Sequence, residues 1–500
     1  MSDAPDPRPL DALAGRARAR HVAVVGGGMA GLVVAIECAK VGLRVTLIER
    51  EERFGGIVRR GELDRMPVEL GATAVRGGVV RALADDAGLG ALVVSPDTDA
   101  TWIGGIPGAG AAPFPAETVL GIPVNPWSDD VRRVIGWSGV WRAYLDRLRP
   151  PLTIGRERSL GRLVSSRMGA RVRDRLVAPP AQAVHGIPPE LVDVDTAVPG
   201  LSPALTRAGS LSGAAGELAA PRGPLETIVG GMSRLVDGMV EQLRTLDADL
   251  RPGTEVVGLD RAERGWSVRL AGGPAVGDAD AAGSDAPGET TVAADGEPAT
   301  VAADVVVVAL PPSAARALLA PVVPELPAEE LPAVEVDQVA LAVDAPGLDA
   351  AARGARVLRV PGSGPAAMAE HESARWRWLR AGGFHVVRVT FPATVTADLS
   401  DADAVDLARR EASVLLGVEL PASAVRAAQR VRFASAPPAT TLGHGAFADA
   451  VRAAVARIPG LAIAGGWVAG SGLGSVVSDA REQAERVRRV LLWGAVPPAG

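Results

Sequence analysis

The stretch His21-Val-Ala-Val-Val-Gly-Gly-Gly-Met-Ala-Gly-Leu-Val-Val-Ala-Ile36 decides the fold of this chain. Its apolar start predicts a buried strand, a glycine-rich turn follows, and a helical pattern continues from the turn. Gly26 permits the tight turn, Gly28 lets the backbone approach a pyrophosphate, and Gly31 lets the helix pack on the strand. Because a helix N-terminus presents positive partial charge to phosphate groups, the stretch predicts a dinucleotide-binding site.

An acidic residue follows the second predicted strand, Leu43-Arg-Val-Thr-Leu-Ile48. Glu49 stands 18 residues after Gly31, close to the spacing of about 20 at which such sites carry a ribose-binding carboxylate. A carboxylate there accepts hydrogen bonds from the ribose hydroxyls and repels a 2′-phosphate, which disfavours NADP. A glycine-rich turn without a ligand is the simpler alternative. The first strand, the glycine-rich turn, the second strand and Glu49 occur together, and this combination disfavours that alternative.

Two further glycine-containing segments resemble those of the flavoprotein oxidases in the amine oxidase and porphyrinogen oxidase superfamily. They are Arg53-Phe-Gly-Gly56 and Val68-Glu-Leu-Gly-Ala-Thr73. Near the C-terminus, Gly460-Leu-Ala-Ile-Ala-Gly-Gly466 reads as a strand, and Ser471-Gly-Leu-Gly-Ser475 opens a predicted helix. The resemblance implies bound, non-covalent FAD, held by Gly26, Gly27, Gly28, Met29, Ala30, Gly31, Glu49, Gly55, Gly56, Ile57, Gly71, Ala72, Thr73, Ala74, Val256, Gly466, Ser471, Gly472 and Leu473.

The expected fold class is α/β, with a two-dinucleotide-fold (Rossmann-like) FAD-binding domain built from discontinuous segments. We expect residues 20–76, 225–312 and 456–492 to form this domain. Within it, residues 271–302 are rich in Ala, Gly, Asp, Glu and Thr, which predicts a flexible acidic insert.

The remaining segments are expected to form the substrate side of the protein. Residues 77–224 read as a mainly helical substrate and membrane-contact domain, residues 313–455 as an α+β substrate domain, and residues 1–19 as a disordered lead. Four tryptophans lie in the helical segment, where they belong to a core, line an apolar pocket or touch lipid: Trp102, Trp127, Trp137 and Trp141.

Composition limits the functions open to the chain. It has 500 residues, 48% of them hydrophobic, which suits about three domains with large cores. The net charge of −6 gives no general attraction to nucleic acid. The sequence offers no secretion signal and no apolar run of the roughly 18 residues that a membrane span needs. We therefore expect a cytoplasmic protein, with peripheral membrane contact left open.

Over nearly the whole chain, the sequence most closely resembles the oxygen-dependent porphyrinogen oxidases. That group comprises protoporphyrinogen oxidase and its bacterial coproporphyrinogen III relative. The motifs are Glu117-Thr-Val-Leu-Gly-Ile-Pro-Val124, Ser159 to Val177 with Val184-His-Gly-Ile187, Trp376-Arg-Trp378 and Gly443-His-Gly445. The resemblance implies six-electron oxidation of a porphyrinogen to a porphyrin in haem biosynthesis, with oxygen reduced to hydrogen peroxide. It also implies a ferrochelatase as a pathway partner.

The composition favours coproporphyrinogen III over protoporphyrinogen IX as the substrate. The chain is rich in alanine and arginine and nearly free of lysine, a bias similar to that of high-GC actinobacteria, whose porphyrinogen oxidases resemble the coproporphyrinogen enzyme. Lys40 and Tyr144 are the only residues of their types, so the lysine and aromatic pair typical of amine oxidases of this fold are missing. The five histidines lack metal-ligand spacing, and we assign no metal and no catalytic side chain.

Anchoring of substrate propionates requires cations, and an arginine fork suits a carboxylate best. Arg76 follows the segment Val68 to Thr73, which the resemblance places beside the flavin ring and which we call the flavin-facing segment. Arg76 is the predicted anchor, with an ordinary surface arginine as the alternative. Asp99 stands near a position where the family carries a basic residue. This departure keeps a second function open, oxidation or desaturation of another apolar polycycle or a polyene, and a third, a non-catalytic flavin-binding scaffold.

Overall fold

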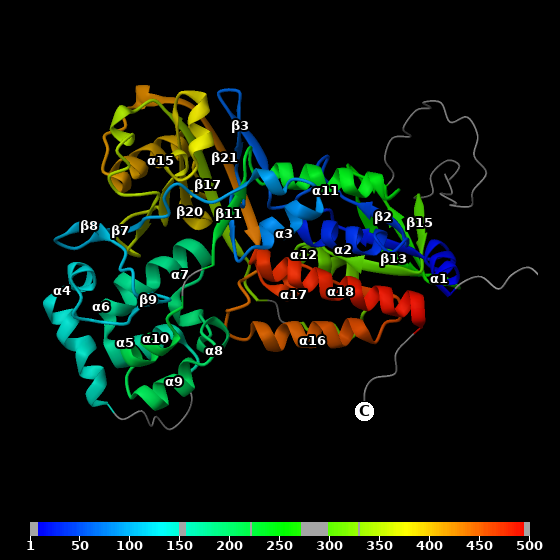
Figure 1. Ribbon diagram of the computed structural model, residues 1–500, viewed down its shortest axis with the longest axis horizontal. Coiled ribbons are helices and arrows are strands. Elements are labelled where there is room, and N and C mark those ends of the chain that lie inside the picture. The colour runs from blue at the N-terminus through cyan, green and yellow to red at the C-terminus, as the bar shows by residue number, and fades with distance from the viewer. Residues whose placement is uncertain (1–8, 150–156, 221–222, 272–298, 329–330, 495–500) are drawn as a thin grey trace, which may run out of the picture.

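The computed structural model describes residues 9–149, 157–220, 223–271, 299–328 and 331–494. Three units lie side by side: a dinucleotide unit, a seven-stranded sheet with its helix α15 (Asp401–Leu416), and a helical unit (Figure 1). Most of the predicted insert 271–302 lies outside the described residues, and its last three residues belong to a strand, Thr300–Ala303.

The dinucleotide unit is built on a five-stranded parallel sheet in the order β12-β2-β1-β16-β22. Four of its strands are mainly apolar and largely buried: β1 His21–Val25, β2 Arg44–Ile48, β16 Val305–Val308 and β22 Leu461–Ile463. The edge strand β12 Asp249–Arg251 is polar and has no buried residue. One face is covered by α2 Met29–Ala39, α3 Val79–Asp86, α11 Ser233–Thr245 and α18 Leu473–Trp493. Three distant segments of the chain thus share one sheet, as the sequence predicts.

The other face of that sheet packs on elements from both sides of a predicted domain boundary. They are β13 Val256–Arg261, β14 Trp266–Leu270, β15 Thr300–Ala303, α12 Pro312–Leu319, α16 His444–Ala456 and α17 Gly466–Ala469. We expected residues 313–455 to belong to the substrate domain. Instead, α12 and α16 pack with this unit because their buried faces, for example Leu319 and Val451, meet Val306 and Val308 of β16.

The seven-stranded sheet has the order β21-β17-β20-β19-β18-β7-β8. Its strands are β7 Thr101–Ile106, β8 Gly110–Pro113, β17 Val334–Val343, β18 Arg356–Arg359, β19 Met368–His371, β20 His385–Pro392 and β21 Val425–Ser435. Helix α15 covers one face, and β3 Arg60–Leu63 and β4 Met66–Glu69 approach the other. The prediction that 77–224 is mainly helical is therefore wrong for β7 and β8, because β7 pairs in parallel with the distant β18.

The helical unit is formed by seven helices from the 77–224 segment. Its helices are α4 Asp129–Tyr144, α5 Leu160–Met168, α6 Ala170–Val172, α7 Ala178–His185, α8 Val194–Ala197, α9 Leu201–Ala208 and α10 Leu211–Leu218. They enclose one apolar core. Trp137 and Trp141 do not join it, since 59% and 56% of them are exposed. Within the described part of the chain, no helix is both long and apolar enough to cross a membrane.

Part of the predicted disordered lead is a helix. Helix α1 Pro9–Arg18 lies against α18, where Ala17 is buried and Leu13 packs on the core of the dinucleotide unit. The prediction of disorder is wrong there because Leu13 and Ala17, four residues apart on one face of the helix, pack against a distant part of the chain. Local composition does not reveal such tertiary packing. Residues 1–8 lie outside the described part.

Five short strands form two further small sheets. They are β5 Val75–Arg76, β6 Val93–Val94, β9 Thr118–Val119, β10 Ile122–Pro123 and β11 Leu225–Ile228. Strand β11 pairs with both β5 and β6. This small sheet fixes the segment that follows Thr73 against the start of the second dinucleotide segment.

Candidate dinucleotide and substrate site

The turn between β1 and α2 is packed as tightly as the sequence predicts. Gly26 has a φ of +105°, which favours glycine. A Cβ atom on Gly31 would lie 1.8 Å from the carbonyl oxygen of Gly26. Gly28 is the N-cap of α2, and no side chain of the described residues caps this helix end. Its N–H groups are thus directed at the space above the turn, as a pyrophosphate requires.

Glu49 lies directly beside this turn. Its Oε2 accepts a hydrogen bond from the Gly27 N–H at 2.7 Å, and its Oε1 accepts one from the Glu51 N–H at 2.9 Å. The Thr254 N–H donates to the Glu49 carbonyl at 2.8 Å, which brings Val256 to the same end of the sheet. The predicted ribose carboxylate and Val256, another of the predicted FAD-binding residues, therefore lie at the same end of the sheet.

The Gly55-Gly56 pair meets the same turn. The Gly55 N–H donates to the Gly27 carbonyl at 2.8 Å, and Gly55 forms a parallel bridge with Gly28. A Cβ atom on Gly56 would lie 3.2 Å from the Cα of Gly28. The two backbone segments approach each other closely here, so a phosphate group bound at this turn would meet mainly main chain.

The segment Gly71 to Ala74 runs alongside this pair. The Ala72 N–H donates to the Ile57 carbonyl at 3.1 Å, and a Cβ atom on Gly71 would lie 1.8 Å from the same oxygen. The Thr227 hydroxyl donates to the Thr73 carbonyl at 2.6 Å. The start of this segment is therefore held by backbone contacts, and Thr73 is held by a side-chain hydroxyl.

A second helix N-terminus approaches the first. Helix α18 has Gly472 as its N-cap, without a side-chain cap from the described residues, and Leu473 packs in the core that contains Met29 and Ala30. A Cβ atom on Gly465 would lie 3.3 Å from the Ala30 Cβ, which sets Gly466 beside α2. The glycine cradle and two uncapped helix ends fit an adenine dinucleotide cofactor, and the predicted cofactor residues gather around them.

Sequence reasoning missed a buried ion network between this segment and the sheet. Arg388 of β20 donates to the Gly71 carbonyl at 3.0 Å and to the Thr73 hydroxyl at 3.3 Å. It also pairs with Glu370 Oε2 at 2.5 Å and Glu372 Oε1 at 2.7 Å. The only sequence signal is an arginine inside a valine-rich strand, which does not indicate its partners.

Further arginines surround Glu370. Burial raises the pKa of its carboxyl, but the charges of Arg388, Arg356 and Arg375 outweigh burial and hold this pKa well below its usual range. Arg375 Nη2 lies 3.8 Å from Asp99, which also pairs with Arg76. A basic residue at position 99 would face two arginines, which accounts for the aspartate at this position.

Arg76 itself is tied to its surroundings. Besides the pair with Asp99, it donates to the Gly223 carbonyl at 3.1 Å, and 38% of its side chain is exposed. It does not line any of the cavities described below. A substrate carboxylate at Arg76 would have to compete with Asp99.

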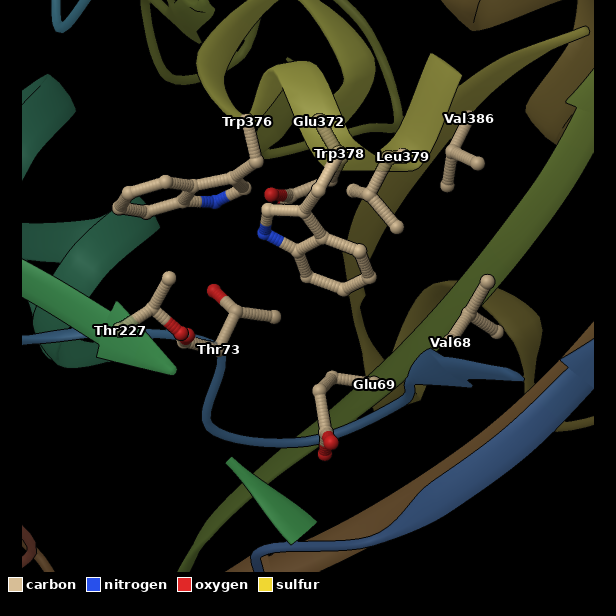
Figure 2. A pocket seen from close by; sticks show the side chains of 9 residues that line it. All are labelled: Val68, Glu69, Thr73, Thr227, Glu372, Trp376, Trp378, Leu379 and Val386. Atoms are coloured by element: carbon tan, nitrogen blue, oxygen red, sulfur yellow. The ribbon is translucent and has the colours of Figure 1, made fainter. Parts of the chain in front are cut away.

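Two cavities adjoin this region. The first, of about 20 Å³, is lined by Thr73, Glu372, Trp376 and Trp378 among others (Figure 2). Both indole N–H groups and Glu372 Oε2 are buried there without a hydrogen-bond partner among the described residues. The second, of about 310 Å³, lies between α7 and the sheet and is lined by residues such as Gln182, Gly186, Val336, Arg359 and Thr390.

Comparisons with known proteins agree with this architecture. The family model described as flavin containing amine oxidoreductase matches residues 29–492. The chain is 25% identical, over 93% of its length and 90% of the relative's, to a coproporphyrinogen III oxidase of Propionibacterium freudenreichii subsp. freudenreichii.

Solved structures share the fold. A protein from Exiguobacterium sp. 255-15, provisionally named a protoporphyrinogen oxidase, superposes with a TM-score of 0.77 at 22% identity, over 94% of this chain and 98% of that one. A reduced UDP-galactopyranose mutase gives 0.66 at 12% identity, over 96% of each chain. The fold thus serves different reactions, so the reaction must be argued from the site. This chain, matched by the family model over most of its length, belongs to the flavin-containing amine oxidoreductases.

Proposed function

We propose that this flavin-dependent oxidoreductase oxidises coproporphyrinogen III to coproporphyrin III in haem biosynthesis, with oxygen as the acceptor and hydrogen peroxide as the second product. The observation that carries the proposal is similarity along nearly the whole chain to a coproporphyrinogen III oxidase, 93% of its length. Retention of the complete glycine cradle supports it. When bound, FAD would supply the two-electron chemistry.

We infer that FAD is bound without a covalent link. Cys38, the single cysteine, is fully buried in α2, and burial raises the pKa of its thiol to about 12, so it presents no thiolate to the cofactor. Acid precipitation of the yellow protein should release the flavin into the supernatant. Flavin that stays with the pellet contradicts this inference.

The residues of the chain supply binding and orientation in this proposal. Glu49 binds the ribose, and the N-termini of α2 and α18 face the pyrophosphate and the flavin ring. Arg388 keeps its charge at every accessible pH and therefore orients Gly71 and Thr73 without acting as a base. We assign no side chain as a general base, since a pyrrole proton can leave to solvent.

The test is aerobic incubation of the holoenzyme with coproporphyrinogen III, protoporphyrinogen IX and a lipid polyene in parallel. Porphyrin fluorescence should rise with kcat/KM highest for coproporphyrinogen III. Loss of polyene absorbance without porphyrin formation would instead support the polyene alternative. A protein that turns over none of the three while its flavin is intact would contradict the porphyrinogen proposal.

Protoporphyrinogen IX is the second candidate substrate, and the Arg76–Asp99 pair favours it. Asp99 neutralises the predicted anchor, and this candidate carries two propionates instead of four. If Arg76 does anchor a propionate, Arg76→Ala raises KM more than it lowers kcat, because a remote contact is made equally in the ground and transition states. An unchanged KM would exclude Arg76 as the anchor.

We also infer a peripheral membrane contact through one helix face. Trp137, Trp141, Leu145 and Leu148 follow helical spacing along α4 and the turn after it, and 45% to 75% of each is exposed. The exposed arginines Arg133, Arg147 and Arg149 flank them. Aromatic and aliphatic side chains beside arginines are typical of interfacial helices on anionic bilayers.

Co-sedimentation with vesicles tests this contact. Binding to anionic vesicles should fall when Trp137 and Trp141 are both changed to Ser, and should persist in the control Trp493→Ser, whose tryptophan is 63% exposed at the far end of α18. Equal binding by all three proteins would contradict the inference. A ferrochelatase that takes up the porphyrin product is our proposed protein partner, and sedimentation velocity of the mixture tests it.

A further inference from the structure

A buried ion network with more arginines than carboxylates lies between the seven-stranded sheet and the flavin-facing segment. Arg388 Nη2 lies 2.5 Å from Glu370 Oε2 and 2.7 Å from Glu372 Oε1. Arg356 and Arg375 each contact the other oxygen of Glu370, Oε1, at 3.0 Å. Three positive charges thus share two negative charges, which leaves a surplus of one positive charge in the network.

Charged groups at the rim of the network do not cancel this surplus. Asp99 lies 3.8 Å from Arg375 and also pairs with Arg76, so Asp99 and Arg76 add one charge of each sign. Glu69 belongs to the flavin-facing segment, but its Oε1 accepts hydrogen bonds from the Ser233 N–H and hydroxyl at the start of α11, at 2.8 and 2.6 Å. Burial outweighs these contacts and raises the pKa of the Glu69 carboxyl, which favours its uncharged form.

Arg388 carries the surplus charge to the flavin-facing segment. Its buried guanidinium donates to the Gly71 carbonyl at 3.0 Å and to the Thr73 hydroxyl at 3.3 Å. Figure 2 shows Thr73 and Glu372 reaching the same small cavity from its two sides. Charges buried in this way are screened little by water or salt, so their field extends to whatever the segment contacts.

Two other cations of the dinucleotide unit are balanced by carboxylates. Lys40, the only lysine of the chain, directly follows α2 and pairs with Asp86 at 3.0 Å. Arg60 of β3 pairs with Asp237 at 2.9 Å. Of these cations, only those of the Arg388 network bring unbalanced positive charge to the flavin-facing segment.

An unbalanced positive charge favours the more negative of two cofactor states. When FAD is bound, its reduction by two electrons with uptake of one proton adds one negative charge to the cofactor. In the proposed function the electrons come from the porphyrinogen. A fixed charge that is already in place stabilises the reduced state without any rearrangement of the protein.

We propose that the Arg388 network raises the reduction potential of the bound flavin through its surplus positive charge beside the flavin-facing segment. The proposal rests on the proposed function, because that function places FAD against Val68 to Thr73. It gives the sheet unit a second role, since the network then sets the driving force of flavin reduction as well as holding the segment. The network acts through its charge, and none of its members is a catalytic residue.

Dye-linked reduction of the holoenzyme tests the proposal, because it measures the two-electron midpoint potential without any substrate. Glu372→Gln keeps the side-chain shape and removes one negative charge, and Arg356→Gln removes one positive charge. The matched controls Asp344→Asn and Arg426→Gln make the same two changes at an exposed ion pair of the same sheet unit.

The two network variants should shift the potential in opposite directions. Glu372→Gln should raise the affinity for reduced relative to oxidised flavin about tenfold, the effect of one charge across about 10 Å of protein, which is a rise of about 30 mV. Arg356→Gln should lower this ratio about threefold, or about 15 mV, since Arg356 contacts the Glu370 oxygen that Arg388 does not contact. Both surface controls should match the wild type, because water and salt screen exposed charges.

Three outcomes overturn the proposal. A shift of the same sign in both network variants would show that they disturb packing and do not act through charge. Shifts no larger than those of the surface controls would show that the network charge does not reach the flavin. If Glu372→Gln releases FAD, the sign of the shift in Arg356→Gln decides alone, and release of FAD by both variants would assign the network to folding only. Failure of the proposed function has a different signature, since the wild-type flavin would then accept electrons from the dye system but from no porphyrinogen.

Discussion

The dinucleotide unit and the seven-stranded sheet hold one segment, Gly71 to Arg76, by opposite means. On the dinucleotide side, backbone meets backbone, and Gly71 leaves no space for a Cβ against Ile57. On the sheet side, charges hold it: the buried Arg388 binds its start at Gly71, and the partly exposed Asp99 pairs with Arg76 at its end. Backbone contacts are written into short glycine motifs, whereas Arg388 contacts Gly71 from 317 positions further along the chain.

The largest expected effect, on the free energy of unfolding, comes from removing the buried cation Arg388. Arg388→Met leaves Glu370 and Glu372 buried without their shared cation and should lower the free energy of unfolding by about 3–5 kcal/mol. Urea denaturation followed by tryptophan fluorescence measures it. Arg426→Met, which removes an exposed pair with Asp344 in the same sheet, should be indistinguishable from wild type. Equal stability of the two variants would mean that the buried network contributes no more than a surface pair.

The close backbone packing of the dinucleotide unit is tested at Gly31, where a Cβ atom would clash with the Gly26 carbonyl oxygen. Gly31→Ala would set a Cβ atom 1.8 Å from the Gly26 carbonyl and should weaken FAD binding by about 2–3 kcal/mol through displacement of the turn. Titration of the flavin-free protein with FAD measures the change. Gly15→Ala in α1, where a Cβ meets nothing within 4 Å, is the matched control and should bind FAD normally. The comparison fails if Gly31→Ala binds FAD as tightly as this control.

Acid should weaken the sheet unit through its buried histidines. His371 Nε2 lies 3.1 Å from His385 Nδ1, and burial, followed by the neighbouring His385, lowers the pKa of His371 to about 3. The unfolded chain takes up this proton near pH 6.5, so folding stability is lost as pH falls from about 6.5 towards 3, by roughly 1 kcal/mol per pH unit. Urea denaturation at pH 7, 6 and 5 should show this slope, and His371→Gln should reduce it. An identical slope in the variant would assign the acid sensitivity to other groups.

The smallest effect is expected at the predicted insert. Deletion of residues 273–296 with closure by a short turn should leave flavin content and turnover nearly unchanged, because loop length alters stability only slowly and this composition forms no core. Flavin absorbance and initial rates measure both. A large loss of activity with the flavin retained would identify the tract as part of the substrate machinery.

The sequence predicted the backbone contacts of the cofactor site but not its long-range charged contacts. The positions of Gly26, Glu49 and Gly55 were predictable because each is dictated by local backbone geometry around one ligand type. Arg388 was not, because its partners on Gly71 and Glu370 become neighbours only after the sheet has formed. The helix at 9–18 escaped prediction for the same reason, since its stability depends on α18.

Trp137 and Trp141 show a different limit. A tryptophan in a helical segment is usually part of a core, and the sequence alone left core, pocket and lipid contact open. Helix α4 is kinked at Gly136, where φ is +70° and ψ is 168°, and Trp137 and Trp141 follow the kink with more than half of each residue exposed. Predicting the face of a helix requires its direction in space, which the residue pattern does not contain.

The packing of α18 against α2 affects the stage of synthesis at which the cofactor site is complete. The cofactor cradle begins within the first 31 residues, yet its second helix end starts at Leu473, and Arg388 supports it from between. During synthesis the N-terminal turn therefore emerges long before the chain that closes the site, and a fragment that ends before Leu473 lacks half of the cradle. With FAD bound between these two helix ends as proposed, cofactor capture would be a late event of biosynthesis, and the flavin would contact both the first and the last parts of the polypeptide.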